Sequence, residues 1–245
     1  IAGENNILKN NKTIAVFGSI NDVSGNTVDS IVVGNINKEK SGTRNATFGY
    51  NNTITSATNN ITSGSSNDLT STTNNITSGS SNILINGSNN AIFGSSNNET
   101  STNNSLLTGL SNTSNNSNYI LTQGFGNVIS STNYSIISGT NHSEINGDTN
   151  SLFGKSQTVS DSSAVLLSGL NNTINASKYV NVHGESNIVK TSLNSSVFGN
   201  THKVESTNNV LTSGHLHDVS GNTKQSLVSG YNHKENNGQN NSTFG

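Results

Sequence analysis

The ten residues TNNITSGSSN at 58–67 recur letter for letter at 73–82, fifteen positions further along the chain. The glycine inside this stretch belongs to a longer series, in which a glycine closes a short apolar run. These marker glycines are Gly3, Gly18, Gly34, Gly49, Gly64, Gly79, Gly94, Gly109, Gly124, Gly139, Gly154, Gly169, Gly184, Gly199, Gly214, Gly230 and Gly245. Fourteen of the sixteen intervals are fifteen residues and two are sixteen. A short repeat kept in register for 245 residues predicts one small structural unit stacked many times.

The composition argues against a conventional globular core and against disorder alike. Only 28% of the residues are hydrophobic and 10% are charged, against roughly 45–50% and 25% in typical domains. Disordered chains are usually rich in proline and net charge, but this chain has no proline and a net charge of −2. Scattered Lys and Arg give no basic patch for nucleic acid. No apolar run is long enough to cross a bilayer, and with no cysteine a disulfide framework is excluded.

Fifteen residues rich in Asn, Ser, Thr and Gly suit two short strands and two turns. We therefore predict an all-β parallel solenoid of about 16 rungs, with two short strands in each rung and a single domain over 1–245. The two longer intervals both contain DVSGNT, at 22–27 and 218–223, which places the extra residue in a turn. Within a rung we number positions from the marker glycine, so that −1 precedes it and +1 follows it.

The side-chain sizes at positions −1 and −3 are correlated: a large residue at one goes with a small residue at the other. Where −1 is Phe, −3 is Ala or Ser, and where −1 is Val, Ser, Thr or Gln, −3 is Ile or Leu; only Asn181 with His183 departs from this rule. Constant volume is what close packing demands, so we predict that this pair points into the rung. The predicted core residues are Phe17, Phe48, Phe93, Phe153 and Phe198.

The second strand supplies two further inward positions. Position +5 is mostly Val, Leu or Ile, and position +3 is Asn in most rungs, where stacked amides can form a hydrogen-bonded ladder. Glu39, Glu99, Glu144 and Glu235 stand at +5 in their own rungs. The sequence leaves open whether these four side chains face inward or toward another chain.

The outward positions predict an oligomer. Positions +4 and +6 carry charges, whereas −2 and −4 carry none in any rung. A long uncharged apolar strip is larger than monomers usually expose, so we predict that parallel copies pack through it in a cyclic assembly. The predicted trimer-interface residues are Val16, Val32, Ile92, Leu107, Ile137, Leu152, Leu167, Val182, Val197 and Val228.

The tandem runs TIAVFG (13–18), DSIVVG (29–34), NNAIFG (89–94), NSSVFG (194–199) and QSLVSG (225–230) resemble the YadA-like head of trimeric autotransporter adhesins. The resemblance covers 3–245 and implies a left-handed parallel β-roll in a homotrimer. It also implies a location on the bacterial cell surface, with anchoring through a C-terminal outer-membrane domain beyond this chain. The implied partner is a host surface receptor or extracellular matrix protein. The Asn-rich composition is similar to that of fusobacterial members, which would imply a receptor of the carcinoembryonic-antigen-related adhesion family. Polar rungs such as NNITSG (59–64) depart from the family pattern.

The titratable residues do not predict chemistry. His202, His217 and His233 occupy the +3 slot in three successive rungs, with His142 in the same slot earlier. Stacked imidazoles could bind a metal or sense pH, but replacement of Asn as a ladder donor is the simpler interpretation. His142 with Glu144, and His233 with Glu235, could be written as acid/base couples, yet a regular solenoid offers no water-excluding pocket. We expect no enzyme, no catalytic residue, no cofactor and no metal.

Receptor contact would use exposed apolar or aromatic anchors. The candidates are Leu110 and Phe125 at +1, and Tyr119 and Tyr134 at the opposite corner. An alternative function is ice binding, which the Thr47, Thr62, Thr77 column suggests because a flat Thr array can match a lattice.

Overall fold

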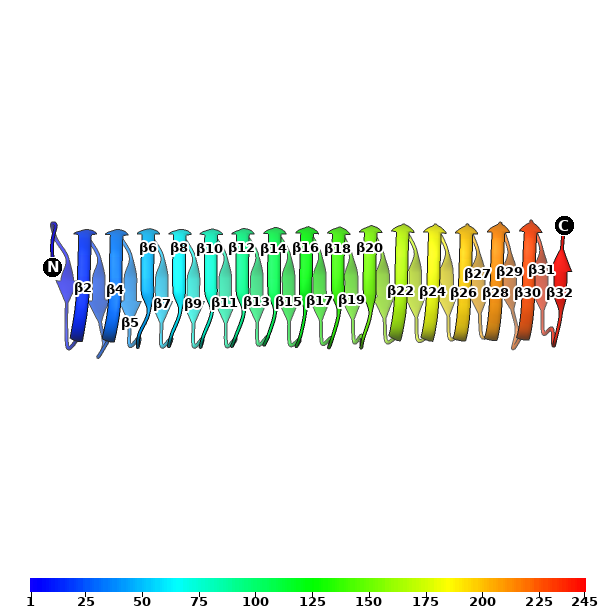
Figure 1. Cartoon of the computed structure of the whole chain (residues 1–245), viewed down its shortest axis with the longest axis horizontal. Helices are drawn as coiled ribbons and strands as arrows, with labels where there is room; N and C mark the ends of the chain where they lie inside the picture. The colour runs from blue at the N-terminus through cyan, green and yellow to red at the C-terminus, as the bar shows by residue number, and fades with distance from the viewer. The chain divides into compact units, whose positions relative to one another are not determined.

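The computed structural model describes all residues from 1 to 245 and contains strands but no helix (Figure 1). The chain makes about 16 turns, each built from one even-numbered and one odd-numbered strand. It divides into two compact units, Ile1–Phe125 and Gly126–Gly245. The all-β solenoid predicted from the period is confirmed. That residues 1–245 form a single domain stays a prediction.

In the N-terminal unit, the even-numbered strands form one sheet, here called sheet A. They are β2 (Lys12–Ser19), β4 (Val28–Asn35), β6 (Ala46–Tyr50), β8 (Ile61–Ser65), β10 (Ile76–Ser80), β12 (Ala91–Ser95), β14 (Leu106–Leu110) and β16 (Leu121–Phe125). The odd-numbered strands form sheet B. They are β1 (Ile7–Leu8), β3 (Asp22–Ser24), β5 (Lys38–Lys40), β7 (Thr53–Thr55), β9 (Asp68–Thr70), β11 (Ile83–Ile85), β13 (Asn98–Thr100) and β15 (Thr113–Asn115).

The C-terminal unit repeats the arrangement. Its sheet A strands are β18 (Ile136–Thr140), β20 (Ser151–Lys155), β22 (Ser163–Leu170), β24 (Lys178–Glu185), β26 (Leu193–Asn200), β28 (Asn208–His215), β30 (Lys224–Tyr231) and β32 (Ser242–Phe244). Its sheet B strands are β17 (Val128–Ser130), β19 (Ser143–Ile145), β21 (Thr158–Ser160), β23 (Thr173–Asn175), β25 (Ile188–Lys190), β27 (Lys203–Glu205), β29 (Asp218–Ser220) and β31 (Lys234–Asn236).

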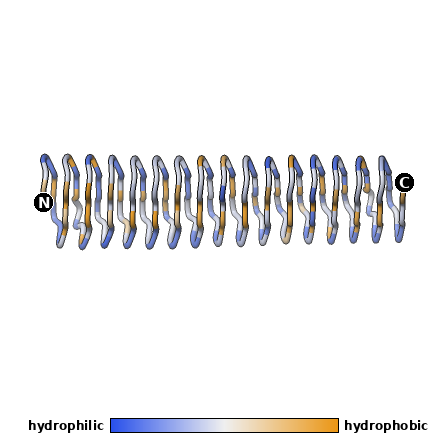
Figure 2. Tube along the Cα trace, turned by 45° about the horizontal axis from the view of Figure 1, so that its top comes forward, coloured by the Kyte–Doolittle hydropathy of each residue, from blue (hydrophilic) through white to orange (hydrophobic).

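Pairing within each sheet is parallel and keeps the sequence period. In β8 and β10, for example, Ile61 faces Ile76 and Gly64 faces Gly79 across the ladder. Equivalent residues therefore stack in columns along each unit, and the hydropathy of the chain repeats from turn to turn (Figure 2). A change at one position is felt by the same position in the neighbouring rungs.

Single residues in the left-handed conformation make the corners. A typical rung has three, at +2, +7 and +10, such as Ser66, Ser71 and Asn74 with φ of 55°, 56° and 58°. Asn adopts this region more readily than most residues, and the corners are mostly Asn and Ser. The polar composition thus follows in part from corner geometry rather than from disorder.

The extra residue of each longer interval lies in a turn, as predicted. Gly25 and Asn26 both have positive φ, 74° and 67°, and the Thr27 hydroxyl donates to the Ser24 carbonyl over 2.9 Å. Two successive positive φ angles are characteristic of a type I′ turn. The equivalent residues Gly221 and Asn222 have φ of 72° and 64°.

The interior of each unit is lined by positions −4, −2, +3, +5 and +8, and this overturns the predicted interface. Val16, Val32, Ile92, Leu107, Ile137, Leu152, Leu167, Val182, Val197 and Val228, predicted to face sister chains, are all 0% exposed. They stand at −2, where they pack with the +5 aliphatics, as Ile92 and Leu107 do with Leu84. A side chain with no exposed surface cannot contact a neighbouring chain.

The predicted aromatic core is wrong for the same reason. Phe17, Phe48, Phe93, Phe153 and Phe198 lie on the outer face of sheet A, with exposures of 49%, 39%, 41%, 39% and 37%. Side chains alternate between faces along a strand, so placing −2 inside forces −1 and −3 outside. The marker glycine lies two residues after −2 and therefore on the same, inner face of the strand. A Cβ added to it would overlap the carbonyl oxygen of the glycine in the next rung.

Ladders of polar side chains line the interior at +3 and, at Asn45, Asn60, Asn75 and Asn90 of the N-terminal unit, also at −4. At +3, the Asn67 side chain donates to Asn52 Oδ1 and to the Gly79 carbonyl oxygen, both at 3.0 Å, which confirms the predicted ladder. A second ladder, not predicted, runs at −4, where Asn75 Nδ2 donates to Asn60 Oδ1 over 3.0 Å. Buried polar groups at these positions are paired, as a low-dielectric interior requires.

The outer face of sheet B is wet and charged, as the sequence predicted. Lys38, Lys40, Lys190, Lys203 and Lys234 are exposed there. The structure has no helix with the length and hydropathy to span a bilayer.

Candidate functional site

The outer face of sheet A presents one large apolar side chain in nearly every rung. We call the −1 and −3 side chains of this face the apolar stripe. In the N-terminal unit its large members are 36–49% exposed, namely Phe17, Ile31, Phe48, Ile61, Ile76, Phe93, Leu106 and Leu121. In the C-terminal unit they are Ile136, Phe153, Leu166, Phe198, Leu211 and Phe244, with exposures of 37–67%.

No Asp, Glu, Lys or Arg interrupts the apolar stripe. With eight rungs at ~4.8 Å and a width of ~10 Å, the stripe covers roughly 400 Å² in each unit. The largest apolar patch on a monomer is of this size and often functional. The combined volume of the −1 and −3 side chains stays nearly constant from rung to rung, which suggested a core. On the outer face, the same constancy gives a ridge of even height that suits close packing against another surface.

The stripe widens at β14 and β16. Leu110 and Phe125, which face each other across the ladder at +1, are 42% and 46% exposed. Together with Leu106 and Leu121 at −3 they give four exposed apolar side chains on two neighbouring strands. The structure thus brings the first predicted receptor-contact pair together on the outer face of sheet A.

The tyrosine candidates occupy corners. Tyr119 in the N-terminal unit and Tyr134 in the C-terminal unit both stand at +10 with positive φ, 55° and 53°. Their side chains are 51% and 58% exposed. Each therefore offers an aromatic edge beside sheet A, in its own unit.

The histidine column replaces asparagine in the +3 ladder. His202 and His217 stack with ring centroids 4.7 Å apart, and His217 and His233 with centroids 5.2 Å apart. The backbone N–H of His217 donates to Nδ1 of His202 over 3.2 Å, as the backbone of an Asn rung donates to Oδ1. Nε2 of His202 lies 3.1 Å from the Phe198 carbonyl oxygen. An imidazole with an acceptor at Nδ1 and a donor at Nε2 offers the same pair of functions as an amide.

This bonding pattern favours the neutral ring. Burial lowers the pKa of His142, His202 and His217 below its usual value, partly offset by hydrogen bonds to backbone carbonyls. A proton on Nδ1 would also oppose the N–H that donates to it. The arrangement brings together no group of three His, Cys, Asp or Glu able to hold a metal ion.

The four glutamates at +5 face inward, which answers the question that the sequence left open. Glu39, Glu99 and Glu144 are 0% exposed and Glu235 is 9% exposed. In the first site, Oε1 of Glu39 accepts from the Ser30 hydroxyl over 2.7 Å and from the Asn45 amide over 2.9 Å. Burial raises the pKa of Glu39, and these two hydrogen bonds oppose that rise.

The same set recurs twice and could have been found in the sequence. Glu144 accepts from Ser135 and Asn150, and Glu235 accepts from Ser226 and Asn241. In all three sites the +8 residue is glycine (Gly42, Gly147 and Gly238), because a Cβ there would overlap the glutamate oxygen. Ser at −4, Glu at +5, Gly at +8 and Asn at the next −4 is therefore a correlated signal.

Glu99 is the fourth glutamate and has a different setting. Its Oε1 accepts from the Ser105 hydroxyl, and burial raises its pKa to about 7. Oε2 of each of the four glutamates is buried without a partner. These carboxyls are structural groups inside the roll, and the pairs with His142 and His233 are not couples facing a pocket.

The threonine column behind the ice-binding alternative is inside the molecule. Thr47, Thr62 and Thr77 are 0%, 1% and 1% exposed. They stand at −2, so their hydroxyls cannot form a flat outer array. The feature that suggested ice binding is absent from the surface.

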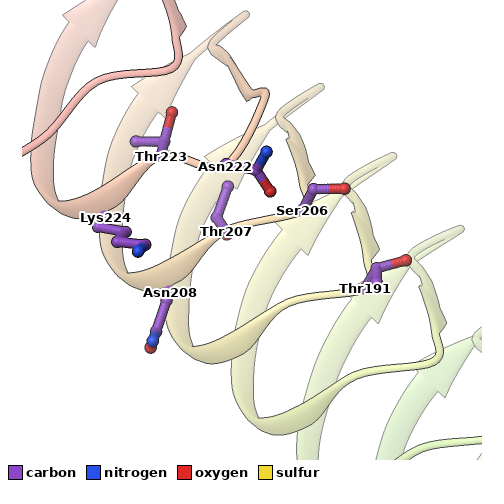
Figure 3. A pocket seen from close by; sticks show the side chains of 7 residues that line it. All are labelled: Thr191, Ser206, Thr207, Asn208, Asn222, Thr223 and Lys224. Carbon is purple, nitrogen blue, oxygen red and sulfur yellow. The ribbon is translucent and has the colours of Figure 1, made fainter.

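A polar groove lies at the corner between sheet B and sheet A in the C-terminal unit (Figure 3). It has a volume of about 250 Å³ and is lined by Thr191, Ser206, Thr207, Asn208, Asn222, Thr223 and Lys224. The groove borders the longer turn at 218–223. No sequence pattern predicted it.

Comparisons with known proteins add little. No family model and no curated protein matches the chain. A solved structure from Desulfovibrio desulfuricans G20, described as a "putative acetyltransferase", aligns with a TM-score of 0.16 and 7% identity. The alignment covers 90% of this chain and 65% of that one. A likeness this weak carries no argument about fold or function.

Proposed function

We propose that this chain is the head of a bacterial cell-surface adhesin. In this proposal three parallel copies pack through the apolar stripe of sheet A, and the charged outer face of sheet B stays in water. The head binds a host surface receptor, such as a carcinoembryonic-antigen-related adhesion molecule, or an extracellular matrix protein. A domain outside this chain anchors it in the outer membrane.

The observation that carries the proposal is the uncharged apolar stripe. An exposed large apolar residue in nearly every rung favours association, because a contiguous apolar patch of this size often marks an interaction surface. Sister copies are suited to cover it, since identical rungs repeat at the same spacing and a cyclic assembly closes without leaving a stripe exposed. The interface residues of this proposal are the −1 and −3 residues, not the buried −2 residues first predicted.

Receptor binding falls to the margin of the stripe. Leu110 and Phe125 stand at +1, next to the stripe on the side where the chain leaves sheet A. Buried aromatic and aliphatic anchors dominate the energy of most protein interfaces. The pair is the strongest anchor among the described residues at +1, where most other rungs carry polar residues.

Biolayer interferometry with the purified fragment tests the proposal. The probes are ectodomains of carcinoembryonic-antigen-related adhesion molecules, collagen, fibronectin and laminin. We expect saturable binding to at least one probe, and at least a tenfold loss of affinity in the double variant Leu110→Glu, Phe125→Glu. Leu170→Glu, at the same rung position in the C-terminal unit, is the matched control and should keep binding. Absence of binding to every probe would contradict the adhesin proposal.

A further inference from the structure

We propose that the polar groove of Figure 3 binds a single sugar residue that carries a carboxylate. This inference rests on the proposed function in one respect only: if the chain is an adhesin head, the ligand comes from a glycan on the host surface. The site itself is argued from the groove.

The sixteen-residue rung makes the groove. Thr191 and Ser206 turn their rungs at +7 with φ of 51° and 54°, one left-handed residue each. The following rung needs two such residues, Gly221 and Asn222, so its turn differs from those of the rungs before it. The groove lies beside this change in the turn.

Several polar groups in the groove have no partner within the protein. Oδ1 of Asn208 is buried and accepts no hydrogen bond. Lys224, its neighbour across the ladder, is exposed and forms no ion pair. By contrast, the hydroxyls of Thr207 and Thr223 are already bonded, to Ser192 Oγ over 3.1 Å and to the Ser220 carbonyl over 2.7 Å. The Lys224 ammonium is therefore the charged group of the groove that is open to a ligand.

The accessible charged and polar groups of the groove suit a sugar that carries a carboxylate. The Lys224 ammonium can pair with the carboxylate, and the Asn222 amide can donate to one hydroxyl and accept from another. The volume of about 250 Å³ lies below the roughly 300 to 1,000 Å³ of pockets for drug-sized ligands, so one ring fits. No aromatic residue lines the groove, so the ring is held by hydrogen bonds rather than by stacking and binding is weak.

The chain contains its own comparison. The identical DVSGNT turn at 22–27 has the same backbone conformation, with Asn26 at φ of 67°. There, Lys12 and Val28 face each other across the ladder where Asn208 and Lys224 do in the C-terminal unit. Beside the first turn the cation, Lys12, therefore stands one rung earlier, in the place of Asn208, and Val28 takes the place of Lys224.

Saturation-transfer NMR on the whole 245-residue fragment tests the site, with 3′-sialyllactose, methyl glucuronide and lactose as probes at millimolar concentration. We expect transfer to the ring protons of the acidic sugars and none to lactose. The stronger of the two acidic probes identifies the source as a sialylated or a uronate-containing glycan. Because the pair is ionic, raising the salt to 0.5 M should weaken binding several-fold.

Four variants localise the ligand. Lys224→Gln should weaken binding at least tenfold, and Lys178→Gln, in the same column of sheet A, should leave it unchanged. Asn222→Gly keeps the left-handed backbone and should weaken binding several-fold, whereas Asn26→Gly should not. Circular dichroism checks that each variant is folded.

Equal transfer to lactose, no transfer to either acidic sugar, or unchanged binding in folded Lys224→Gln would overturn the inference. Salt-insensitive binding to the wild-type fragment would do the same without any variant. None of these results depends on oligomer formation or on binding to a protein receptor, so failure of the groove is distinct from failure of the adhesin proposal.

Discussion

Glycine at the marker position and asparagine at +3 are selected by the same neighbouring group, the carbonyl oxygen of the next marker glycine. Asn67 Nδ2 donates to the Gly79 carbonyl over 3.0 Å, and a Cβ on Gly64 would overlap that oxygen. The marker glycine must leave room for this oxygen, and the +3 asparagine must donate a hydrogen bond to it. The repeat therefore tolerates little change at these two positions, and much at the outer ones.

Gly79→Ala tests this constraint. The variant should lose about 3 kcal/mol or more of unfolding free energy, because its φ of 129° is strained for alanine and its Cβ would overlap the Gly94 carbonyl. Gly126→Ser is the control, since other rungs carry Ser in that left-handed corner. Urea unfolding followed by circular dichroism measures both. Equal stability of the two variants would show that the close approach is not a constraint.

Glu99→Gln tests the buried carboxyl. The unfolded chain releases this proton near its usual pKa of 4.5, whereas the folded chain keeps it up to a pKa of about 7. The unfolding free energy of the wild type should therefore fall as pH rises from about 4.5 to 7, by up to ~3 kcal/mol. The Gln variant should lack this fall and be the more stable protein at pH 8. A parallel pH dependence of the two proteins would mean that Glu99 is ionised in the fold.

His217→Asn tests the histidine ladder at the opposite end of the pH range. Burial lowers the pKa of His217, so below its usual value of 6.5 the unfolded chain takes up a proton that the folded chain resists. Stability is fully present above pH 6.5 and is lost as pH falls, by up to ~1.4 kcal/mol per pH unit for one group. The variant should lose less stability between pH 6.5 and 4.5. An equal loss of stability in the variant and the wild type over this range would contradict the neutral-ring ladder.

At the scale of the strand, the sequence predicted the register of the sheets but not which face of sheet A lies inside. The fifteen-residue period, the two strands, the turn at 22–27 and the +3 ladder all follow from patterns that repeat. Alternation along a strand separates two sets of residues without saying which is buried. Phe93 was predicted inside because its volume compensates for the small Ala91 at −3, whereas the structure buries Ile92. The marker glycine is the signal that identifies the inner face. It lies on the same face of the strand as −2, where the next rung leaves no room for a Cβ.

The candidate sites divide in the same way. The role of His202 could be predicted because it fills a slot held by Asn elsewhere. The Glu39 cluster was not predicted, since its partners Ser30 and Asn45 stand at −4, which was assigned to the outside. The polar groove was not predicted, because it depends on how the turn of one rung differs from the turns of its neighbours. The repeat pattern describes only what the rungs have in common.

Ile92→Ala and Phe93→Ala, neighbours on opposite faces of β12, test the assignment of faces. Ile92→Ala removes fully buried methyl groups and should cost about 2–5 kcal/mol of unfolding free energy. Phe93→Ala changes a side chain that is 41% exposed, so its cost to the isolated chain should be less than half of that. Urea titrations at low protein concentration, where chains are separate, provide the comparison. A larger loss for Phe93→Ala would restore the aromatic core that the structure rejects.

At the scale of the molecule, each rung is stabilised by its two neighbours, as in other solenoids. The interior of each unit is narrow and partly polar, so much of the apolar surface, including Phe17, Ile61 and Leu121, remains outside. Roughly 25 cal/mol is gained per Å² of apolar surface buried, and association is the way in which this surface can still be buried. The account of function therefore depends on what covers the apolar stripe.

Light scattering coupled to size exclusion measures this most directly. At micromolar concentration the wild-type fragment should elute with three times its 25.5 kDa protomer mass. The double variant Ile76→Lys, Phe93→Lys should elute as a folded protomer, and Thr55→Lys, on the outer face of sheet B, should remain a trimer. A wild-type fragment that elutes at 25.5 kDa, or a trimer that survives both lysines in the stripe, would contradict the account.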